Sequence, residues 1–145
     1  MTFEDVPDNL GELPLDDPTL IADVLDLFVT RQMCDDGALL VLICDQQRRL
    51  IQPMVIEDIE VCPPDDALLM LDNLVQPLTQ VRGATLLIAL ARPGRLSVCA
   101  CDIGWAEVIG TACAGRVELI GMHLVTASGS LPIARPAAGP STVSA

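Results

Sequence analysis

Two continuous apolar runs restrict the fold of this chain more than any other feature. The first spans residues 38–44 and the second spans residues 84–91, and neither contains a charged side chain. Runs of this length, closed by a polar residue or by a Pro-Gly turn, are typical of strands buried inside a sheet. The second run is the more apolar and is expected to be the central strand. Both runs need a cover of helices, and they therefore predict an α/β domain.

The segments between the runs supply the other elements. Asp17 followed by Pro18 is typical of a helix start, and apolar residues recur at helical spacing from there to about residue 30. A second helix is expected after Asp65 and a third after Asp102, each Asp acting as the N-cap. The predicted order is α-β-β-α-β-α-β, with a single mixed sheet and about three helices. The elements are expected near residues 17–30, 38–44, 49–56, 66–82, 84–91, 103–114 and 117–126.

The ends of the chain differ from its middle in composition. Residues 1–16 are acidic and rich in Pro, which predicts a flexible lead, and residues 127–145 are rich in Ala, Pro, Ser and Gly, which predicts a flexible tail. Residues 131–134 are the one part of the tail that could add a short edge strand. The α/β domain is therefore expected to span residues 17–126, which is enough chain for one core.

The charge is unevenly distributed along the sequence. Residues 1–72 hold 17 acidic residues and three Arg, a net charge of −14, whereas residues 73–145 carry a net charge of +2. An acidic surface repels phosphate backbones and anionic lipids, so we expect neither nucleic acid nor a membrane as partner. The acidic half either attracts a basic protein partner or keeps an apolar chain soluble.

The sequence predicts a cytoplasmic protein. No uncharged stretch is long and apolar enough for a membrane span, and the acidic N-terminus lacks the basic and apolar regions of a secretory signal. The six Cys are therefore not expected to form a disulfide framework. Several of them lie in apolar runs, where Cys packs as a small hydrophobic residue.

Complete catalytic and cofactor motifs are missing from the sequence. The one His, His123, lies within an apolar strand and is expected to be structural, so a triad of the usual kind is not available. The Gly-rich loops that bind phosphates and the Asp-rich loop that binds calcium are also absent. We therefore expect no cofactor and favour a protein without catalytic activity.

A loop after the central strand holds the candidate ligand-binding residues. Arg92 and Arg95 follow the end of that strand, where α/β proteins often bind ligands, and Asp102 is expected to begin a helix nearby. Together they would suit a small anion or a nucleotide-like ligand. The alternative is that the two Arg are solvated and partly balance the negative charge of the acidic half of the sequence. Trp105 near the start of that helix is either an interface anchor or a core residue.

Cys99 and Cys101 form the closest pair of Cys in the sequence. Their spacing is shorter than the two to four residues usual in zinc sites, and no second pair accompanies them. An atypical zinc or thiol site would need further ligands, of which Asp102, Cys113 and His123 are conceivable. The alternative is a loop of small residues in an apolar setting.

Several short strings resemble the JAB/RadC-like family. Residues 39–51, LLVLICDQQRRLI, are similar to the family's strand and turn "LLxLDxxNRLI". Residues 86–94 take the place of the strand that leads into the motif His-Asn-His-Pro-Ser-Gly, and Asp102 follows at the distance of the family's Asp. Residues 119–125, LIGMHLV, are similar to the closing strand "LLDHxIV".

The resemblance covers residues 38–126 and departs from the family at its metal site. Leu90 and Arg92 stand where the family has its two metal-binding His, and neither can coordinate zinc. The resemblance therefore implies a degenerate member without peptidase chemistry. Family members of that kind act as scaffolds or interaction subunits. We accordingly expect a non-catalytic protein–protein interaction module or a homo-oligomer, with the anion-binding and thiol or zinc functions as alternatives.

Overall fold

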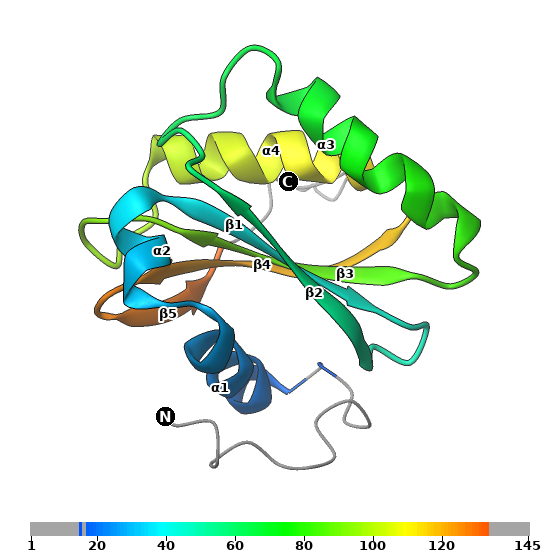
Figure 1. The fold of residues 1–145 in the computed structure, drawn as a ribbon, viewed down its shortest axis with the longest axis horizontal. Helices are drawn as coiled ribbons and strands as arrows, with labels where there is room; N and C mark the ends of the chain where they lie inside the picture. Colours follow the sequence, from blue (N-terminus) through cyan, green and yellow to red (C-terminus); the bar gives the residue numbers. More distant parts are fainter. Residues whose placement is uncertain (1–14, 16, 134–145) are drawn as a thin grey trace, which may run out of the picture.

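A five-stranded sheet between two layers of helices forms the body of the protein (Figure 1). The structure is a computed structural model, and it describes residue 15 and residues 17–133. The predicted lead at 1–16 lies outside the described residues except for Leu15, and the predicted tail lies outside them beyond residue 133. In the described part of the chain, no helix has the length and apolar character needed to cross a membrane.

The elements follow one another in an order close to the predicted one. They are α1 (Pro18–Phe28), α2 (Arg31–Asp36), β1 (Ala38–Cys44), β2 (Leu50–Glu57), α3 (Ala67–Val75), the 3₁₀ helix η3 (Gln76–Gln80), β3 (Thr85–Ala91), α4 (Ala100–Cys113), β4 (Glu118–Thr126) and β5 (Gly129–Pro132).

The sheet is mixed, with the order β2-β1-β3-β4-β5. β3 and β4 are parallel and are joined by α4, whereas the other three neighbouring pairs are antiparallel. β1 and β3 lie side by side, and all seven residues of each are buried. The predicted α/β class with a mixed sheet is confirmed, and the two apolar runs form two of its three interior strands, with β3 at the centre.

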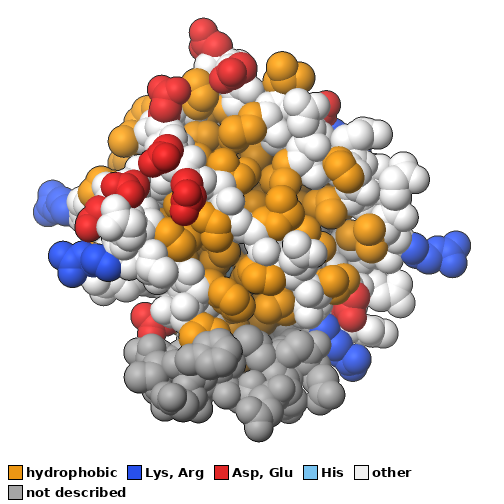
Figure 2. Space-filling model, viewed as in Figure 1, with side chains coloured by type: hydrophobic (Ala, Val, Ile, Leu, Met, Phe, Trp, Pro, Cys, Tyr) orange, Lys and Arg blue, Asp and Glu red, His pale blue; other side chains and the backbone are white. Residues whose placement is uncertain are grey.

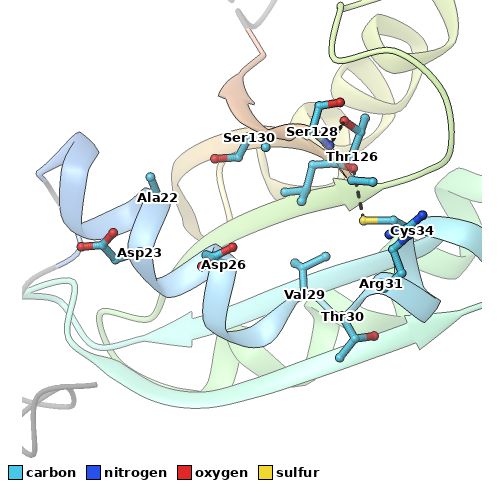
Figure 3. A pocket seen from close by; sticks show the side chains of 13 residues that line it. Ala22, Asp23, Asp26, Val29, Thr30, Arg31, Cys34, Thr126, Ser128 and Ser130 are labelled. Carbon is cyan, nitrogen blue, oxygen red and sulfur yellow. Dashed lines mark hydrogen bonds between the residues drawn. The ribbon is translucent and has the colours of Figure 1, made fainter. Parts of the chain in front are cut away.

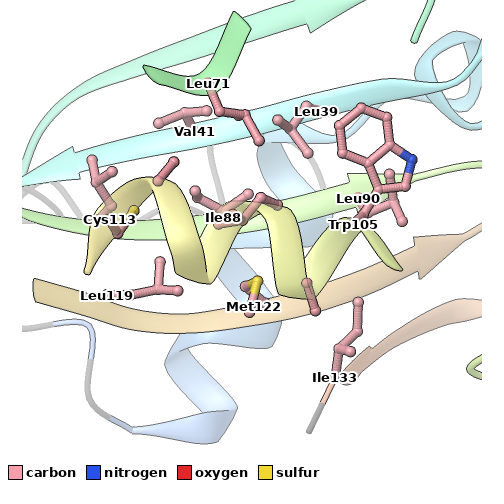
Figure 4. Packing of buried hydrophobic residues seen from close by; sticks show 14 of the residues in the cluster. Leu39, Val41, Leu71, Ile88, Leu90, Trp105, Cys113, Leu119, Met122 and Ile133 are labelled. Carbon is pink, nitrogen blue, oxygen red and sulfur yellow. The ribbon is translucent and has the colours of Figure 1, made fainter. Parts of the chain in front are cut away.

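Alternate residues of the interior strands point into two separate cores. On one face, Leu39, Val41 and Ile88 pack against α3 and α4, and Figure 4 shows this cluster. On the other face, Leu40 and Leu42 pack against α1 and α2. Because both faces are covered, a charged side chain in β1 or β3 would be buried, which explains why neither strand contains one.

Helix starts differ from the expected ones at two places. Asp17 caps α1 as predicted, and its carboxylate accepts a hydrogen bond from the amide of Leu20. α3 has Asp66 as its N-cap residue, where Asp65 was expected, and its side chain makes no cap hydrogen bond. α4 begins three residues before the expected start, with Cys99 as its N-cap residue, so the prediction that Asp102 caps this helix is wrong.

Two short elements were not assigned to the domain in advance. α2 is a six-residue helix capped by Thr30, whose hydroxyl accepts a hydrogen bond from the amide of Met33. β5 falls at residues 129–132, within the expected tail and slightly before the edge strand expected at 131–134. It pairs with the last residues of β4, so the folded domain extends past residue 126.

Candidate functional site

A buried ion pair joins the end of β3 to the first turn of α4. The Arg92 guanidinium donates hydrogen bonds from Nε and Nη2 to the two carboxylate oxygens of Asp102, both at 2.8 Å. It also donates to the carbonyls of Pro93 and Ser97, each at 2.9 Å. The Arg92 side chain is 10% exposed and that of Asp102 is fully buried. Four hydrogen bonds to protein acceptors hold the guanidinium inside the loop.

The protonation state of Asp102 follows from this arrangement. Burial by itself would raise the pKa of the Asp102 carboxyl, but the hydrogen bonds from Arg92 and from the amide of Cys99 outweigh burial and hold this pKa below its ordinary value. The same pairing raises the pKa of Arg92. Asp102 is therefore ionised and Arg92 protonated over the whole physiological range, and the pair is electrically neutral as a unit.

The loop does not present the predicted anion site. Arg92 and Asp102, expected to act side by side on a ligand, are bound to each other, and Arg95 is left as an exposed side chain. The alternative of two solvated Arg residues is also wrong for Arg92, since it is buried. Trp105 is 1% exposed and packs in the α3–α4 core, which confirms the core alternative over the interface anchor (Figure 4).

The Cys residues near the start of α4 pair in a way that the sequence did not indicate. Cys101 forms a disulfide with Cys62, with 4.6 Å between their Cα atoms, and Cys99 is an exposed free thiol. The alternative in which Cys99 and Cys101 act together in a thiol or zinc site therefore has no support in this arrangement. The disulfide fixes the segment after β2 to the first turn of α4. Trp105 does the same, because its Nε1 donates to the carbonyls of Glu60 and Val61 at 3.1 Å.

His123 lies on the opposite face of the sheet from Cys99 and Cys101. Its neighbours in the strand, Met122 and Leu124, point toward α4, whereas His123 points with Val125 toward the α1 side. Nδ1 is buried and has no hydrogen-bond partner, and burial lowers the pKa of the imidazole. A zinc site that combines this His with the two Cys is therefore excluded by the fold. Among the described residues, no three His, Cys, Asp or Glu side chains gather as metal ligands.

A polar pocket lies between the first helices and the β4–β5 hairpin (Figure 3). Its volume is about 480 Å³. Asp23 and Asp26 from α1 lie on one side and the hydroxyl groups of Thr126, Ser128 and Ser130 on the other. These groups can donate and accept hydrogen bonds to a polar ligand.

The open edge of β2 is the most unusual surface of the molecule. Among residue 15 and residues 17–133, β2 pairs only with β1, so no described strand adjoins its outer backbone groups. Ile51 is 56% exposed and Val55 is 44% exposed, and Pro53 lies between them. Figure 2 shows apolar side chains across the middle of the face on which β2 lies, with acidic side chains gathered along one side of that area. We call Ile51, Pro53 and Val55 the apolar edge.

An acidic segment follows the apolar edge directly. Residues 57–66 contain five acidic residues and neither Lys nor Arg. All five acidic side chains are exposed. The ion pairs of Arg31, Arg48, Arg92 and Arg116 are all made with acidic residues outside this segment. The five acids are Glu57, Asp58, Glu60, Asp65 and Asp66.

Reasoning from the sequence found only part of this surface. A Pro within a predicted strand indicates an edge strand, and Pro53 lies in β2, which is outermost in the described sheet. The sequence did not indicate that Ile51 and Val55 are exposed, because apolar residues in a strand are normally buried. The pairing of Cys62 with Cys101 could not be found either, since spacing alone does not fix disulfide connectivity.

Comparisons of the chain with protein-family models, with curated proteins and with solved structures found no match.

Proposed function

We propose that this chain is a non-catalytic protein-interaction module that binds an extended basic segment of a partner protein along β2. One observation carries the proposal. The eight-residue edge strand exposes apolar side chains and is followed immediately by five acidic residues that are not ion-paired within the described chain.

Strand addition is the binding mode that suits an open edge. An extended peptide placed beside β2 gains main-chain hydrogen bonds from the outward backbone groups, while its side chains contact the apolar edge. The opposite edge of the sheet is less suitable, because β5 has only four residues. Pro53 lacks a backbone donor, and we place its nitrogen on the outer side of the strand, where Pro is tolerated. The incoming segment therefore binds on either side of this position.

Charge determines which segment fits. Acidic side chains beside an apolar strip favour a partner with Lys or Arg among apolar residues, and they disfavour acidic or phosphate-rich molecules. A second copy of this chain is a poorer occupant, since each copy has a net charge of −12. The proposed partner is thus a basic protein segment rather than another copy.

The proposed relation to the JAB/RadC-like family agrees with a function without catalysis. The positions that the resemblance aligns with a metal-binding His and with the family's Asp are Arg92 and Asp102, and these two side chains bind each other. Leu90, at the other metal-binding position, is 4% exposed and belongs to the α3–α4 core. A cytoplasmic location is part of the same proposal.

A direct test uses a labelled ten-residue peptide of alternating Val and Lys as the probe. We expect this peptide to bind and to shift the amide resonances of β2, and we expect a Val–Glu peptide of equal length not to bind. The double variant Ile51→Ser/Val55→Ser should weaken binding by about tenfold or more, since it removes the apolar contacts. Val81→Ser is the matched control, because Val81 is equally exposed (45%) and lies outside β2.

A second set of variants tests the acidic segment separately. Glu57→Gln, Asp58→Asn and Glu60→Gln together should weaken binding at low salt and make it less sensitive to salt, since screening acts on exposed charges. Equal binding of both peptides would contradict the proposal. Peptide-induced shifts away from β2 would contradict it too. A concentration-dependent dimer that buries β2 without peptide would replace it with self-association.

A further inference from the structure

The Cys62–Cys101 disulfide and Cys99 are accessible, whereas the other three Cys residues are not. Cys62 is exposed and Cys101 is half-buried, whereas Cys34, Cys44 and Cys113 are buried. Burial raises the pKa of Cys44 to about 12, with Asp45 adding to the effect, so its thiol is inert. An external thiol can therefore reach a sulfur of the disulfide without unfolding the domain.

The two sulfurs of this disulfide have different surroundings. Cys62 lies in the acidic segment, away from regular secondary structure. Cys101 is the second residue of α4, a 14-residue helix, where the unpaired amide groups of the first turn stabilise negative charge. The neighbouring Asp102 does not cancel this effect, because Arg92 neutralises its charge. In an exchange reaction the better leaving group is the sulfur that best carries the negative charge, and here this is Cys101.

We propose that Cys62–Cys101 is a reversible thiol-exchange site at which an external thiol binds covalently to Cys62. The attacking thiolate forms a bond to Cys62 Sγ, the bond between Cys62 and Cys101 breaks, and Cys101 leaves with the electron pair as a thiolate. A second molecule of the thiol then attacks the mixed disulfide at its own sulfur. That step releases Cys62 as a thiol and gives the oxidised dimer of the external thiol.

Charge around the disulfide selects among external thiols. Glu60, Asp65 and Asp66 lie within four residues of Cys62, and all are exposed. They repel an anionic thiol such as glutathione and attract a cationic one, and the difference is largest at low ionic strength. The chemical class that this site suits is therefore a thiol that carries a positive charge, either a small aminothiol or a Cys flanked by Lys or Arg.

Opening the disulfide loosens the acidic segment without unfolding the domain. After exchange, the segment remains attached to α4 through the hydrogen bonds from Trp105 to Glu60 and Val61, and to Gly37 through the amide of Ile59. We expect residues 58–66 to exchange amide hydrogens faster, while β1 and β3 stay protected. Any change in peptide binding at β2 rests on the proposed function, whereas the exchange reaction does not.

The experiment uses the full chain with Cys99→Ser, which removes the other exposed thiol and places a good N-cap residue on α4. Cysteamine and glutathione are the probes, each at low and high salt. The reaction is quenched with iodoacetamide and the modified Cys is located by mass spectrometry. We expect the mixed disulfide on Cys62, and we expect cysteamine to react several-fold faster than glutathione at low salt, with a smaller difference at high salt.

Three results would overturn the proposal. The first is a mixed disulfide located mainly on Cys101. The second is a reaction that requires denaturant, and the third is an oxidised chain in which all six thiols are still titratable after unfolding. Cys34, Cys44 and Cys113 are internal controls, since they should stay unmodified throughout. None of these readouts involves a partner, so the exchange site and the docking surface can fail independently.

Discussion

At the scale of single residues, the buried Arg92–Asp102 ion pair is expected to be sensitive to substitution of either partner. Asp102→Asn keeps the shape of the side chain but leaves the buried Arg92 charge without a partner. We expect a loss of about 3–5 kcal/mol in the free energy of unfolding, measured by urea denaturation. Arg95→Ala, on an exposed residue of the same loop, should change stability by less than about 0.5 kcal/mol.

A double variant shows whether the stability lost in Asp102→Asn comes from an unpaired buried charge or from a loss of packing. Arg92→Met combined with Asp102→Leu removes both charges, and it should recover most of the stability lost in Asp102→Asn. A cost below about 1 kcal/mol for Asp102→Asn would show that solvent reaches the pair.

His123 gives a pH dependence that can be followed directly. Because burial lowers its pKa in the folded state, the unfolded chain binds a proton more readily below the ordinary pKa of about 6.5. The neutral imidazole therefore favours the folded state above pH 6.5, and this contribution is lost as pH falls through the folded-state pKa. We expect urea denaturation to show the wild type losing stability relative to His123→Leu between pH 7 and about pH 5.5.

The same residue offers an independent measurement. The chain has a single His, so one imidazole signal in an NMR titration reports its pKa without assignment. A midpoint at or above 6.5 would contradict the buried, unpartnered environment that the structure gives to Nδ1.

At the scale of elements, Pro53 limits what the open edge of β2 can pair with. Pro at the centre of an edge strand removes an outward donor and discourages pairing with other chains. Pro53→Val restores that donor and should shift sedimentation velocity profiles toward dimers and larger species. Gln52→Val is the matched control, because it adds the same side chain to the same strand at a position that already has a backbone donor. Equal self-association of the two variants would show that side-chain hydrophobicity, and not the donor, is responsible.

The elements also show which features a sequence can reveal. The bounds of β1 were predicted because every residue in that strand is buried on one face or the other, which leaves no polar residue to obscure the pattern. The start of α4 was misplaced because Asp is a better N-cap than Cys by propensity, whereas the Asp102 carboxylate binds Arg92 and the amide of Cys99. The ion pair and the disulfide depend on tertiary placement, and sequence spacing does not encode it.

At the scale of the whole molecule, the acidic half and the nearly neutral half of the sequence both contribute to the buried core. The acidic half contributes two fully buried features, β1 and the inner face of α1, together with the exposed acidic segment. The nearly neutral half contributes β3, α4 and β4, which form much of the α3–α4 core. Five exposed acidic residues of the acidic half lie in the acidic segment that follows β2, so the docking proposal and the thiol-exchange proposal involve the same segment.

The central pairing of β1 with β3 has a consequence for how the chain reaches its fold. β1 and β2 form a hairpin from adjacent residues, and β3, α4 and β4 form a crossover unit of their own. Only the β1–β3 ladder joins the two units within the sheet, across residues such as Ala38 and Ala91 that are far apart in the chain. Each unit can begin to form from local contacts, and the slow step is then their docking along that ladder. A chain cut in the turn near Gly83 would retain both units intact, so its two fragments have the surfaces they need to reassemble.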